Sequence, residues 1–596
     1  MRSGDRTTSI ARLSALALLV VAVGLRVLTI QSFAGDLRMQ DPILDARYYL
    51  DLAARLSVGQ GWPPGPIFMS PLFPWLLSGL FHFASATPLT VHLALAFLGL
   101  ATLTLLVATV RRDFGSGPAW CAACLFVLFG PILAMEGQIL TESLLLLLGV
   151  AAIRLWPRDQ TNPAWSDFLF GVVTGLLTIG RGVYLLLAAV AVAALGAKRR
   201  WLRGGLVLVG AIIALLPLAV RQTQTSGHFS ILTMNGGMNL YLGNNRTARG
   251  IYSLPPEVDL EKDPTAARSA SIAVGRNLTL AESDRYWRDR AIGALRADPA
   301  RAAWLMGRKA LLFFSPKEIP QIEDFQVLAG AHWPLRVAFL RFGWVLPLAV
   351  LGAAFALRGD RARSTAWLAL IGIGFVSTLL FFATGRYRIP VMGGFLGLAG
   401  VGLHQLWQMR RGVTPRQWVL LPIAVALVQF LFPTYSESKA QAFDAYQLGL
   451  RYQRQGRLEQ AIASMESATR LEPEDATNWH GLGAALVRAG RVPQAIAAYQ
   501  RAVAIDPQVA ATHYNLAIVL ARGGQERLAL DEFRAALAID PLDPAVRSDY
   551  GVALARTGAV EDAVAQWQEA LRIAPGYEPA ARALAAVRGT PGSPAR

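Results

Sequence analysis

AIAAYQRAVAIDP at residues 495–507 decides the architecture of the C-terminal part, because closely related stretches recur beside it. AIASMESATRLEP occupies 461–473, ALDEFRAALAIDP occupies 529–541, and AVAQWQEALRIAP occupies 563–575. Each stretch ends in a proline, and successive prolines are 34 residues apart. A fixed period of this length predicts an array of four repeats, each one supersecondary unit stacked on its neighbour.

Small and large residues alternate at fixed places within these repeats. Two alanine positions recur in register, with one large residue between them, which predicts paired helices in close contact around a filled groove; the large residues are Met465, Tyr499, Phe533 and Trp567. With Leu448-Gly449, Trp479 and Leu482-Gly483, the pattern resembles the tetratricopeptide repeat. We therefore expect an α-solenoid of four repeats and a capping helix over residues 441–590. The resemblance implies binding of a peptide or protein, and His480 and His513 are assigned to packing or surface positions.

The rest of the chain has the composition of a membrane protein. Apolar residues make up 54% of the chain and charged residues 16%, with a mean hydropathy of +0.38, which is too apolar for a soluble protein of this length. Up to residue 440 there are 41 basic and 23 acidic residues, against 16 and 17 afterwards. The basic residues cluster between apolar runs, at 111–112, 198–200, 358–363 and 410–411, which is positive-inside patterning.

Apolar runs predict about eleven membrane crossings, beginning with an uncleaved N-terminal helix. The first apolar run lies within residues 1–30, and further runs lie near 88–110, 117–134, 138–156, 167–197, 201–221, 333–357, 364–384, 387–407 and 415–433. The run 167–197 is too long for one ordinary span, and Gly180-Arg181-Gly182 interrupts it, which predicts two short helices that turn at Arg181. With the basic clusters inside, the loop 33–87, the long loop 222–332 and the tail lie outside.

Short polar motifs stand at the predicted outer boundary. Asp45 lies beside Arg47, Tyr48 and Tyr49; SPLFP follows at 70–74, TES at 141–143, GRG at 180–182 and TGRYRIP at 384–390. In this order they resemble the GT-C superfamily of polyprenyl-phosphate-sugar glycosyltransferases, in particular the bacterial relatives of protein O-mannosyltransferases and the lipid A aminoarabinose transferase. The resemblance covers about residues 10–435, so residues 1–435 are expected to form an all-α, GT-C-like transmembrane bundle.

The resemblance implies an inverting transfer on the periplasmic face of the bacterial inner membrane. The sugar would move from a polyprenyl-phosphate donor to a hydroxyl acceptor on a protein or an envelope glycolipid. Asp45 matches the family's catalytic aspartate, a general base that takes the hydroxyl proton. Many members follow this aspartate with a glutamate, whereas this chain has Ala46, and Asp41 and Asp51 are alternative carboxylates.

Three arginines are candidates for the donor phosphate. Arg386 and Arg388 stand at the outer boundary, and a planar guanidinium binds phosphate oxygens in pairs; the alternative is that they reach the interface from a helix end. Arg181 is costly in lipid unless it faces a polar cavity. Glu142, Glu136 and Tyr49 are candidates to orient the sugar or a divalent metal ion, while Glu142 also suits the first turn of a helix. The sequence has no compact set of His, Asp and Glu, so the need for a metal ion stays open.

Two other functions fit parts of the sequence. An O-antigen ligase or polymerase-like enzyme also combines many helices with a large outer loop and repeats, but would place its key arginines in the late loop. A membrane scaffold without catalytic activity would use the repeats to recruit a partner. Replacing Asp45 with Asn distinguishes these possibilities, because transfer collapses only in the GT-C-like enzyme.

Overall fold

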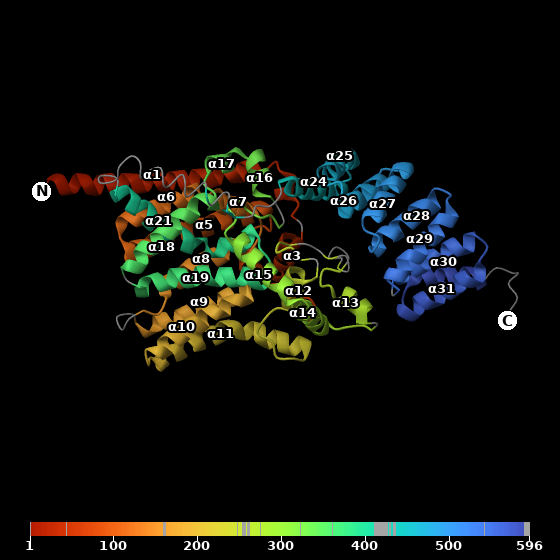
Figure 1. Ribbon diagram of the computed structural model, residues 1–596, viewed down its shortest axis with the longest axis horizontal. Helices are drawn as coiled ribbons and strands as arrows, with labels where there is room; N and C mark the ends of the chain where they lie inside the picture. Colours follow the sequence, from red (N-terminus) through yellow and green to blue (C-terminus); the bar gives the residue numbers. More distant parts are fainter. Residues whose placement is uncertain are drawn as a thin grey trace. The chain divides into compact units, whose positions relative to one another are not determined.

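The computed structural model is all-helical over the residues it describes (Figure 1). It describes residues 2–588 apart from 43, 159–162, 247, 253–254, 256–257, 259–262, 275, 322–323, 360, 410–426, 428–430, 433–436 and 542. Within this part the only β-type pairing consists of two isolated bridges, Phe129 with Leu340 and Ile251 with Ala383. The chain forms two compact units: Met1–Ser253 with Thr279–Tyr435, called the bundle, and Leu254–Leu278 with Ser436–Arg596, called the repeat unit.

The bundle contains long apolar helices, shorter apolar helices and small helices in its two large loops. Its elements are α1 (Arg2–Phe33), α2 (Leu37–Gln40), α3 (Leu44–Ser57), α4 (Leu72–Phe83), α5 (Pro88–Phe114), α6 (Ser116–Leu128), α7 (Gly130–Gly137), α8 (Glu142–Leu155), α9 (Ala164–Gly180), η1 (Gly182–Tyr184), α10 (Leu185–Ala197), α11 (Trp201–Ser226), α12 (Gly236–Asn244), α14 (Leu280–Ala297), α15 (Pro299–Phe313), α16 (Phe325–Ala331), α17 (Trp333–Val337), α18 (Phe342–Arg358), α19 (Arg361–Leu380), α20 (Gly385–Arg388), η2 (Ile389–Val391) and α21 (Met392–Met409).

Five described helices are long and apolar enough to cross a membrane: Leu13–Phe33, Pro88–Phe114, Trp201–Ser226, Arg363–Leu380 and Gly385–Met409. Five more apolar helices have 10–17 residues. The predicted last crossing, 415–433, falls mostly outside the described residues. The number of crossings therefore stays a prediction.

The interrupted run 167–197 does divide at Arg181. Helix α9 ends at Gly180, Arg181 is extended (φ −158°, ψ 114°), and a 3₁₀ turn leads into α10. Gly171 of α9 lies against Val207 of α11, and Gly175 lies against Ala211. The residue numbers of the contacting pairs rise together in the two helices, so α9 and α11 run parallel to each other. Helix α10, which connects them, therefore runs in the opposite direction. A Cβ atom at Gly171 would come within 2.1 Å of the Val207 carbonyl, and such close backbone approach is typical of membrane helices.

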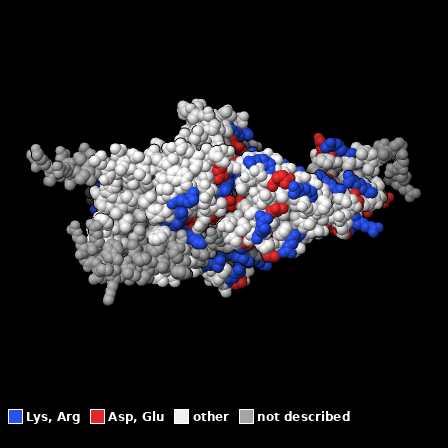
Figure 2. All heavy atoms as spheres, turned by 90° about the horizontal axis from the view of Figure 1, so that it is seen from above, with Lys and Arg blue, Asp and Glu red and all other residues white. Residues whose placement is uncertain are grey.

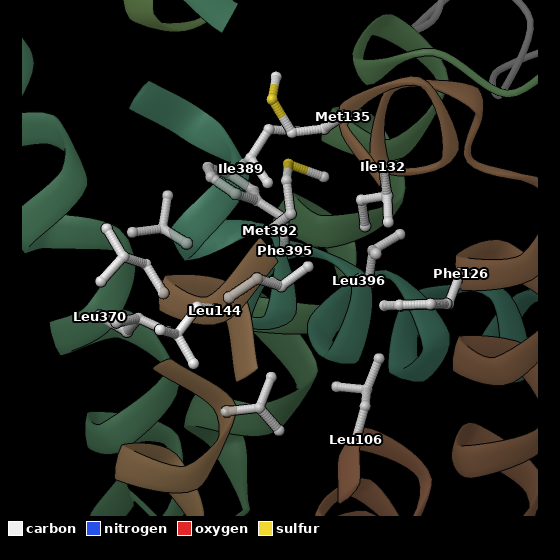
Figure 3. Packing of buried hydrophobic residues seen from close by; sticks show 14 of the residues in the cluster. Leu106, Phe126, Ile132, Met135, Leu144, Leu370, Ile389, Met392, Phe395 and Leu396 are labelled. Carbon is white, nitrogen blue, oxygen red and sulfur yellow. The ribbon is translucent and has the colours of Figure 1, made fainter. Parts of the chain in front are cut away.

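The bundle core is formed by buried aliphatic, methionine and phenylalanine side chains from several helices (Figure 3). Leu106 of α5, Phe126 of α6 and Leu144 of α8 lie in the same cluster as Met392 and Phe395 of α21. The outer surface is apolar as well: large hydrophobic side chains of α1, α5 and α11 are exposed. Figure 2 shows a broad area of the bundle with few charged side chains. This surface suits contact with lipid.

Basic side chains from separate segments meet at one end of the bundle, around Asp113 at the end of α5. Arg158 binds both Asp113 carboxylate oxygens at 2.6 Å, and Arg363 donates to the Asp113 carbonyl at 3.4 Å. Arg112 donates to the Arg154 carbonyl at 2.5 Å. Arg200 completes the group, because its side chain donates to the Arg158 carbonyl at 3.0 Å. Three of the four basic clusters of the sequence thus converge, and residues 410–411 lie outside the described residues.

The repeat unit consists of helix pairs and one short additional helix. Its elements are α13 (Ala267–Val274), α24 (Glu437–Arg454), α25 (Leu458–Leu471), α26 (Ala476–Arg488), α27 (Val492–Ile505), α28 (Ala510–Arg522), α29 (Glu526–Ile539), α30 (Pro544–Arg556), α31 (Val560–Ile573) and α32 (Glu578–Arg588). The turn within each pair contains a glycine with φ between +74° and +90°: Gly456, Gly490, Gly524 and Gly558. Glycine alone adopts this backbone without steric cost.

The predicted repeat packing is confirmed. Met465 is fully buried, and Tyr499, Phe533 and Trp567 are 2% exposed. The alanines of the two recurrent positions are fully buried as well: Ala461, Ala468, Ala495, Ala502, Ala529, Ala536, Ala563 and Ala570. Met465, Tyr499 and Trp567 each face a glycine of the paired helix. A Cβ atom at Gly483 would lie 2.8 Å from the Tyr499 ring, and one at Gly551 would lie 2.5 Å from the Trp567 indole nitrogen.

Three different side chains make the same contact at one repeat position. The indole of Trp479 donates to the Pro473 carbonyl at 2.8 Å, and Arg547 donates to the Pro541 carbonyl at 2.9 Å. The ring of His513 occupies the equivalent place, with Nε2 3.1 Å from the Pro507 carbonyl. The third repeat therefore keeps the geometry without tryptophan, and His513 has a packing role.

Candidate functional site

Four segments far apart in the sequence bring charged side chains to one end of the bundle. Asp45 lies in the first turn of α3 and Glu142 is the first residue of α8. Arg181 follows α9, and Arg386 lies in the short helix α20, just after α19. Since the other ends of α8, α9 and α19 carry the basic residues around Asp113, this cluster lies at the opposite end of the bundle.

Arg386 links two carboxylates. Its Nη1 lies 2.6 Å from Asp45 Oδ2, and its Nε lies 2.5 Å from Glu142 Oε1. Glu142 Oε1 also accepts a hydrogen bond from Arg181 Nη2 at 3.1 Å. The cluster is thus Asp45–Arg386–Glu142–Arg181, with two negative and two positive charges. Hydrogen bonds between charged partners of this kind are short and strong.

Exposure differs sharply within the cluster. The Glu142 side chain is 1% exposed, whereas the Asp45 side chain is 28% exposed. Glu142 Oε2 and Arg181 Nη1 are buried and lack a hydrogen-bond partner among the described residues. A buried charged group with an unused donor or acceptor is costly unless another group binds there. Glu142 is therefore the buried carboxylate of the cluster, and Asp45 is the carboxylate that solvent can reach.

Tyr387 and Tyr252, which are not among the predicted site residues, lie beside these charges. The Arg181 guanidinium lies 3.8 Å from the centre of the Tyr387 ring, a cation–π contact, and Tyr387 stacks on Phe382. Tyr252 reaches the same region because Ala383 N donates to the Gly250 carbonyl at 2.8 Å. Tyr387 is part of the TGRYRIP motif, so the sequence offered a reason to place it at the site. Tyr252 belongs to the long loop 222–332, where no motif pointed to it.

Tyr49 is buried beside Asp45 and packs edge-on against Phe73 at 5.8 Å. Burial raises the pKa of Tyr49, and the Asp45 and Glu142 carboxylates act in the same direction. Burial and Asp45 also raise the pKa of Tyr252. Both phenols thus stay neutral near the carboxylates and keep a proton to donate.

The alternative carboxylates, Asp41 and Asp51, both lie near Arg47. Arg47 is 4.0 Å from Asp41 and 3.7 Å from Asp51. The Asp51 side chain is 73% exposed. Ala46, where many GT-C members have glutamate, is 7% exposed and faces the apolar core. A carboxylate at this position would have to be buried among apolar side chains, which is costly for a charged group.

Arg388 lies outside the cluster. Its Nη1 donates to the carbonyls of Phe313 at 3.2 Å and Ser315 at 2.6 Å. Its Nη2 pairs with Glu318 at 2.7 Å. These contacts attach the turn that carries Arg386 to the segment after α15. The predicted phosphate-binding role of Arg388 stays a prediction, and the structure adds an anchoring contact that the sequence did not reveal.

Glu136 also lies outside the cluster. It pairs with Arg26 of α1 at 2.6 Å, and both side chains are buried. Gly99 of α5 provides the space, because a Cβ atom there would come within 1.9 Å of the Glu136 carboxylate. The predicted role of Glu136 in orienting a sugar or metal stays a prediction.

The described residues contain no group of three His, Cys, Asp or Glu side chains that could hold a metal ion. The positive guanidinium of Arg386 lies between the Asp45 and Glu142 carboxylates. A divalent cation does not fit between them in this arrangement, because it would meet that charge at contact distance.

The comparisons with known proteins concern the repeats. The family model of the tetratricopeptide repeat matches residues 446–510 and 514–578. The C-terminal part is a tetratricopeptide repeat array. No curated protein matches the chain.

Several solved structures are similar to a part of the chain. A MamA from Desulfovibrio magneticus is 22% identical, with 26% of this chain and 87% of that chain covered and a TM-score of 0.25. YrrB, described as a tetratricopeptide repeat protein with an unusual peptide-binding site, is 23% identical, with coverages of 28% and 82% and a TM-score of 0.23. An O-GlcNAc transferase from Thermobaculum terrenum is 24% identical, with coverages of 23% and 27% and a TM-score of 0.22.

Proposed function

We propose that the bundle is a membrane glycosyltransferase of the GT-C kind, which transfers a sugar from a polyprenyl-phosphate donor to a hydroxyl acceptor. The observation that carries this proposal is the cluster Asp45–Arg386–Glu142–Arg181. Its four members come from the four separate motifs that carry Asp45, Glu142, Arg181 and Arg386, on which the family resemblance rests. Unrelated surface charges have no reason to meet in this way.

The position of the cluster supports a location on the outer side. Positive residues concentrate on the cytoplasmic side of membrane proteins, and Arg112, Arg158 and Arg363 gather around Asp113 at the far end of the helices. On this basis the cluster faces the periplasm of a bacterial inner membrane. About eleven crossings remain part of this proposal.

The proposed reaction has one bond-forming and one bond-breaking step. The oxygen of the acceptor hydroxyl attacks the anomeric carbon, its proton passes to Asp45, and the bond from that carbon to the phosphate oxygen breaks. Polyprenyl phosphate leaves with the electron pair, and the configuration of the sugar inverts. The arginines stabilise the negative charge that develops on the phosphate.

The resting ion pairs suggest how donor binding prepares the site. Arg386 is shared between Asp45 and Glu142, whereas the half-buried Arg181 has a buried Nη1 without a hydrogen-bond partner among the described residues. A donor phosphate that binds Arg181 and draws Arg386 toward itself releases the Asp45 carboxylate as the base. Glu142 keeps both guanidinium groups in place. Tyr49 and Tyr387 line the same region for contacts to sugar hydroxyls.

A test compares donors that differ only in the leaving group. The purified full chain in lipid nanodiscs is incubated with one labelled sugar on polyprenyl monophosphate, polyprenyl diphosphate or a nucleoside diphosphate, with an envelope extract as acceptor. We expect release of polyprenyl phosphate and labelled acceptor only with the monophosphate donor. Consumption of the diphosphate donor alone would favour the ligase or polymerase-like enzyme.

The repeats favour a second candidate function, a membrane scaffold that binds a protein partner. Tetratricopeptide arrays present a surface for peptides or proteins. If no donor is consumed while a specific envelope protein is retained by the full chain and lost when residues 441–590 are removed, the scaffold is the better account. In the enzyme, the same repeats would hold the acceptor protein or another envelope component.

A further inference from the structure

We propose that the acidic junction between the third and fourth repeats is an arginine-binding site, and that Arg268 from the long loop 222–332 occupies it. The junction is formed by Asp540 and Asp543, which end α29 and precede α30. Arg268 Nη2 lies 3.1 Å from Asp540 Oδ2 and 2.8 Å from Asp543 Oδ2. The repeat array thus holds a segment of its own chain. This inference does not depend on the glycosyltransferase proposal.

Both carboxylates are partly enclosed. The side chains of Asp540 and Asp543 are 17% and 16% exposed, and Arg268 is 43% exposed. Asp543 uses both oxygens: Oδ1 accepts from Ala545 N at 2.8 Å and so caps α30, while Oδ2 binds the arginine. The two carboxylates and Asp263 raise the pKa of Arg268 against the opposing effect of burial. The junction is therefore complementary to a guanidinium in charge and geometry.

The helix that carries Arg268 depends on external support. Helix α13 has eight residues, and isolated helices of this length are unstable in water. Ala266 and Ala270 are nevertheless fully buried, so the segment packs against other residues. Asp263 supplies an internal cap, with its carboxylate accepting from Ala267 N at 3.2 Å and from Ser269 N at 3.0 Å. Residues Leu254–Leu278 group with the repeats and not with the bundle.

The repeat array contains a natural control for this site. Sixty-eight residues earlier, two repeat lengths back, Glu472 and Asp475 occupy the equivalent junction. Asp475 also caps its helix, with Oδ1 accepting from Thr477 N at 2.9 Å. Glu472 binds Ser438 instead of an arginine. The two junctions match in repeat position and in their helix cap, but only the junction of Asp540 and Asp543 binds Arg268.

The contact has a consequence for the orientation of the chain in the membrane. Both ends of Leu254–Leu278 continue into the loop 222–332. If Arg268 occupies the junction, that loop and the repeats lie on the same side of the membrane. A soluble partner that presents arginine to this junction must first displace Arg268.

The test measures hydrogen exchange in the amides of α13, in the full chain. Arg268→Gln and the pair Asp540→Asn with Asp543→Asn are compared with the matched pair Glu472→Gln with Asp475→Asn. Asparagine caps helices as well as aspartate does, so the fold is retained. We expect exchange in α13 to rise about tenfold in the first two variants, the effect of losing a charge-assisted contact on local opening. The matched pair should leave it unchanged.

Combining Arg268→Gln with the Asp540/Asp543 pair should give no larger effect than either change alone, because both remove the same contact. Unchanged exchange in α13 in either variant would overturn the proposal. So would an equal rise in the matched pair, or full additivity in the combined variant.

Discussion

Replacing Arg386 with Gln probes the centre of the candidate site. The change removes two charge-assisted contacts, at 2.6 Å to Asp45 and 2.5 Å to Glu142. Removing one partner of a buried ion pair costs about 3–5 kcal/mol. Glu142 keeps Arg181 at 3.1 Å, and Asp45 is 28% exposed and can be hydrated. We therefore expect the lower end, about 3 kcal/mol.

If this loss falls on the transition state, transfer slows about 100- to 1000-fold, since 1.4 kcal/mol corresponds to a factor of ten. The assay is the initial rate of transfer from a polyprenyl-phosphate donor in nanodiscs, over a range of donor concentrations. Arg386→Lys keeps the charge but not the planar fork, and we expect an intermediate rate.

The control for Arg386→Gln is Arg47→Gln. Arg47 lies on α3, is 56% exposed and has only long ion pairs, and exposed pairs of this kind contribute little. Its loss should change the rate less than about twofold. The reasoning is refuted if Arg386→Gln transfers sugar as fast as Arg47→Gln.

Four further predictions concern other parts of the chain. Burial lowers the pKa of Lys309 to about 7. The unfolded chain therefore binds this proton more tightly than the folded chain, and the stability of the fold decreases as the pH drops from about 10 toward 7. Lys309→Met should remove this part of the pH dependence of thermal unfolding. Trp567→Ala should destabilise the repeat unit by about 3–5 kcal/mol in urea unfolding followed by circular dichroism, whereas the exposed Leu528→Ala should cost less than about 0.5 kcal/mol. Gly210→Leu should prevent accumulation of the folded chain in membranes, because a Cβ atom there would come within 2.2 Å of the Phe168 carbonyl; normal accumulation would contradict the α9–α11 packing. Alkaline phosphatase fused after residue 590 should be active, and an active cytoplasmic reporter there would contradict an outer repeat unit.

The repeats were predictable because each contact recurs at a fixed period. The alanines and large residues could be aligned by counting from the prolines, and the structure places them in the core. The break at Arg181 was predictable as well, because two glycines flank a charged residue within an apolar run. Local patterns of this kind depend only on neighbouring residues.

The partners of the charged residues were not predictable. Arg386 and Arg388 are two residues apart in one motif, yet Arg386 turns to Asp45 and Glu142 while Arg388 turns to Glu318. The pairing is decided by the fold of the segment after α15, which has no periodic signal. The contact of Arg268 with the repeats joins residues more than 270 positions apart, and Arg268 itself stands in no recognisable motif.

The central claim, that Asp45 is the base of a sugar transfer, is tested most directly by the ratio of two rates. Asp45→Asn and Asp51→Asn are the same substitution on the same helix, and Asp51 is 73% exposed and, among the described residues, pairs only with Arg47. With a polyprenyl-phosphate donor, we expect Asp45→Asn to lower the transfer rate about 10²- to 10⁴-fold and Asp51→Asn to leave it within about twofold. Equal rates in the two variants would contradict the account.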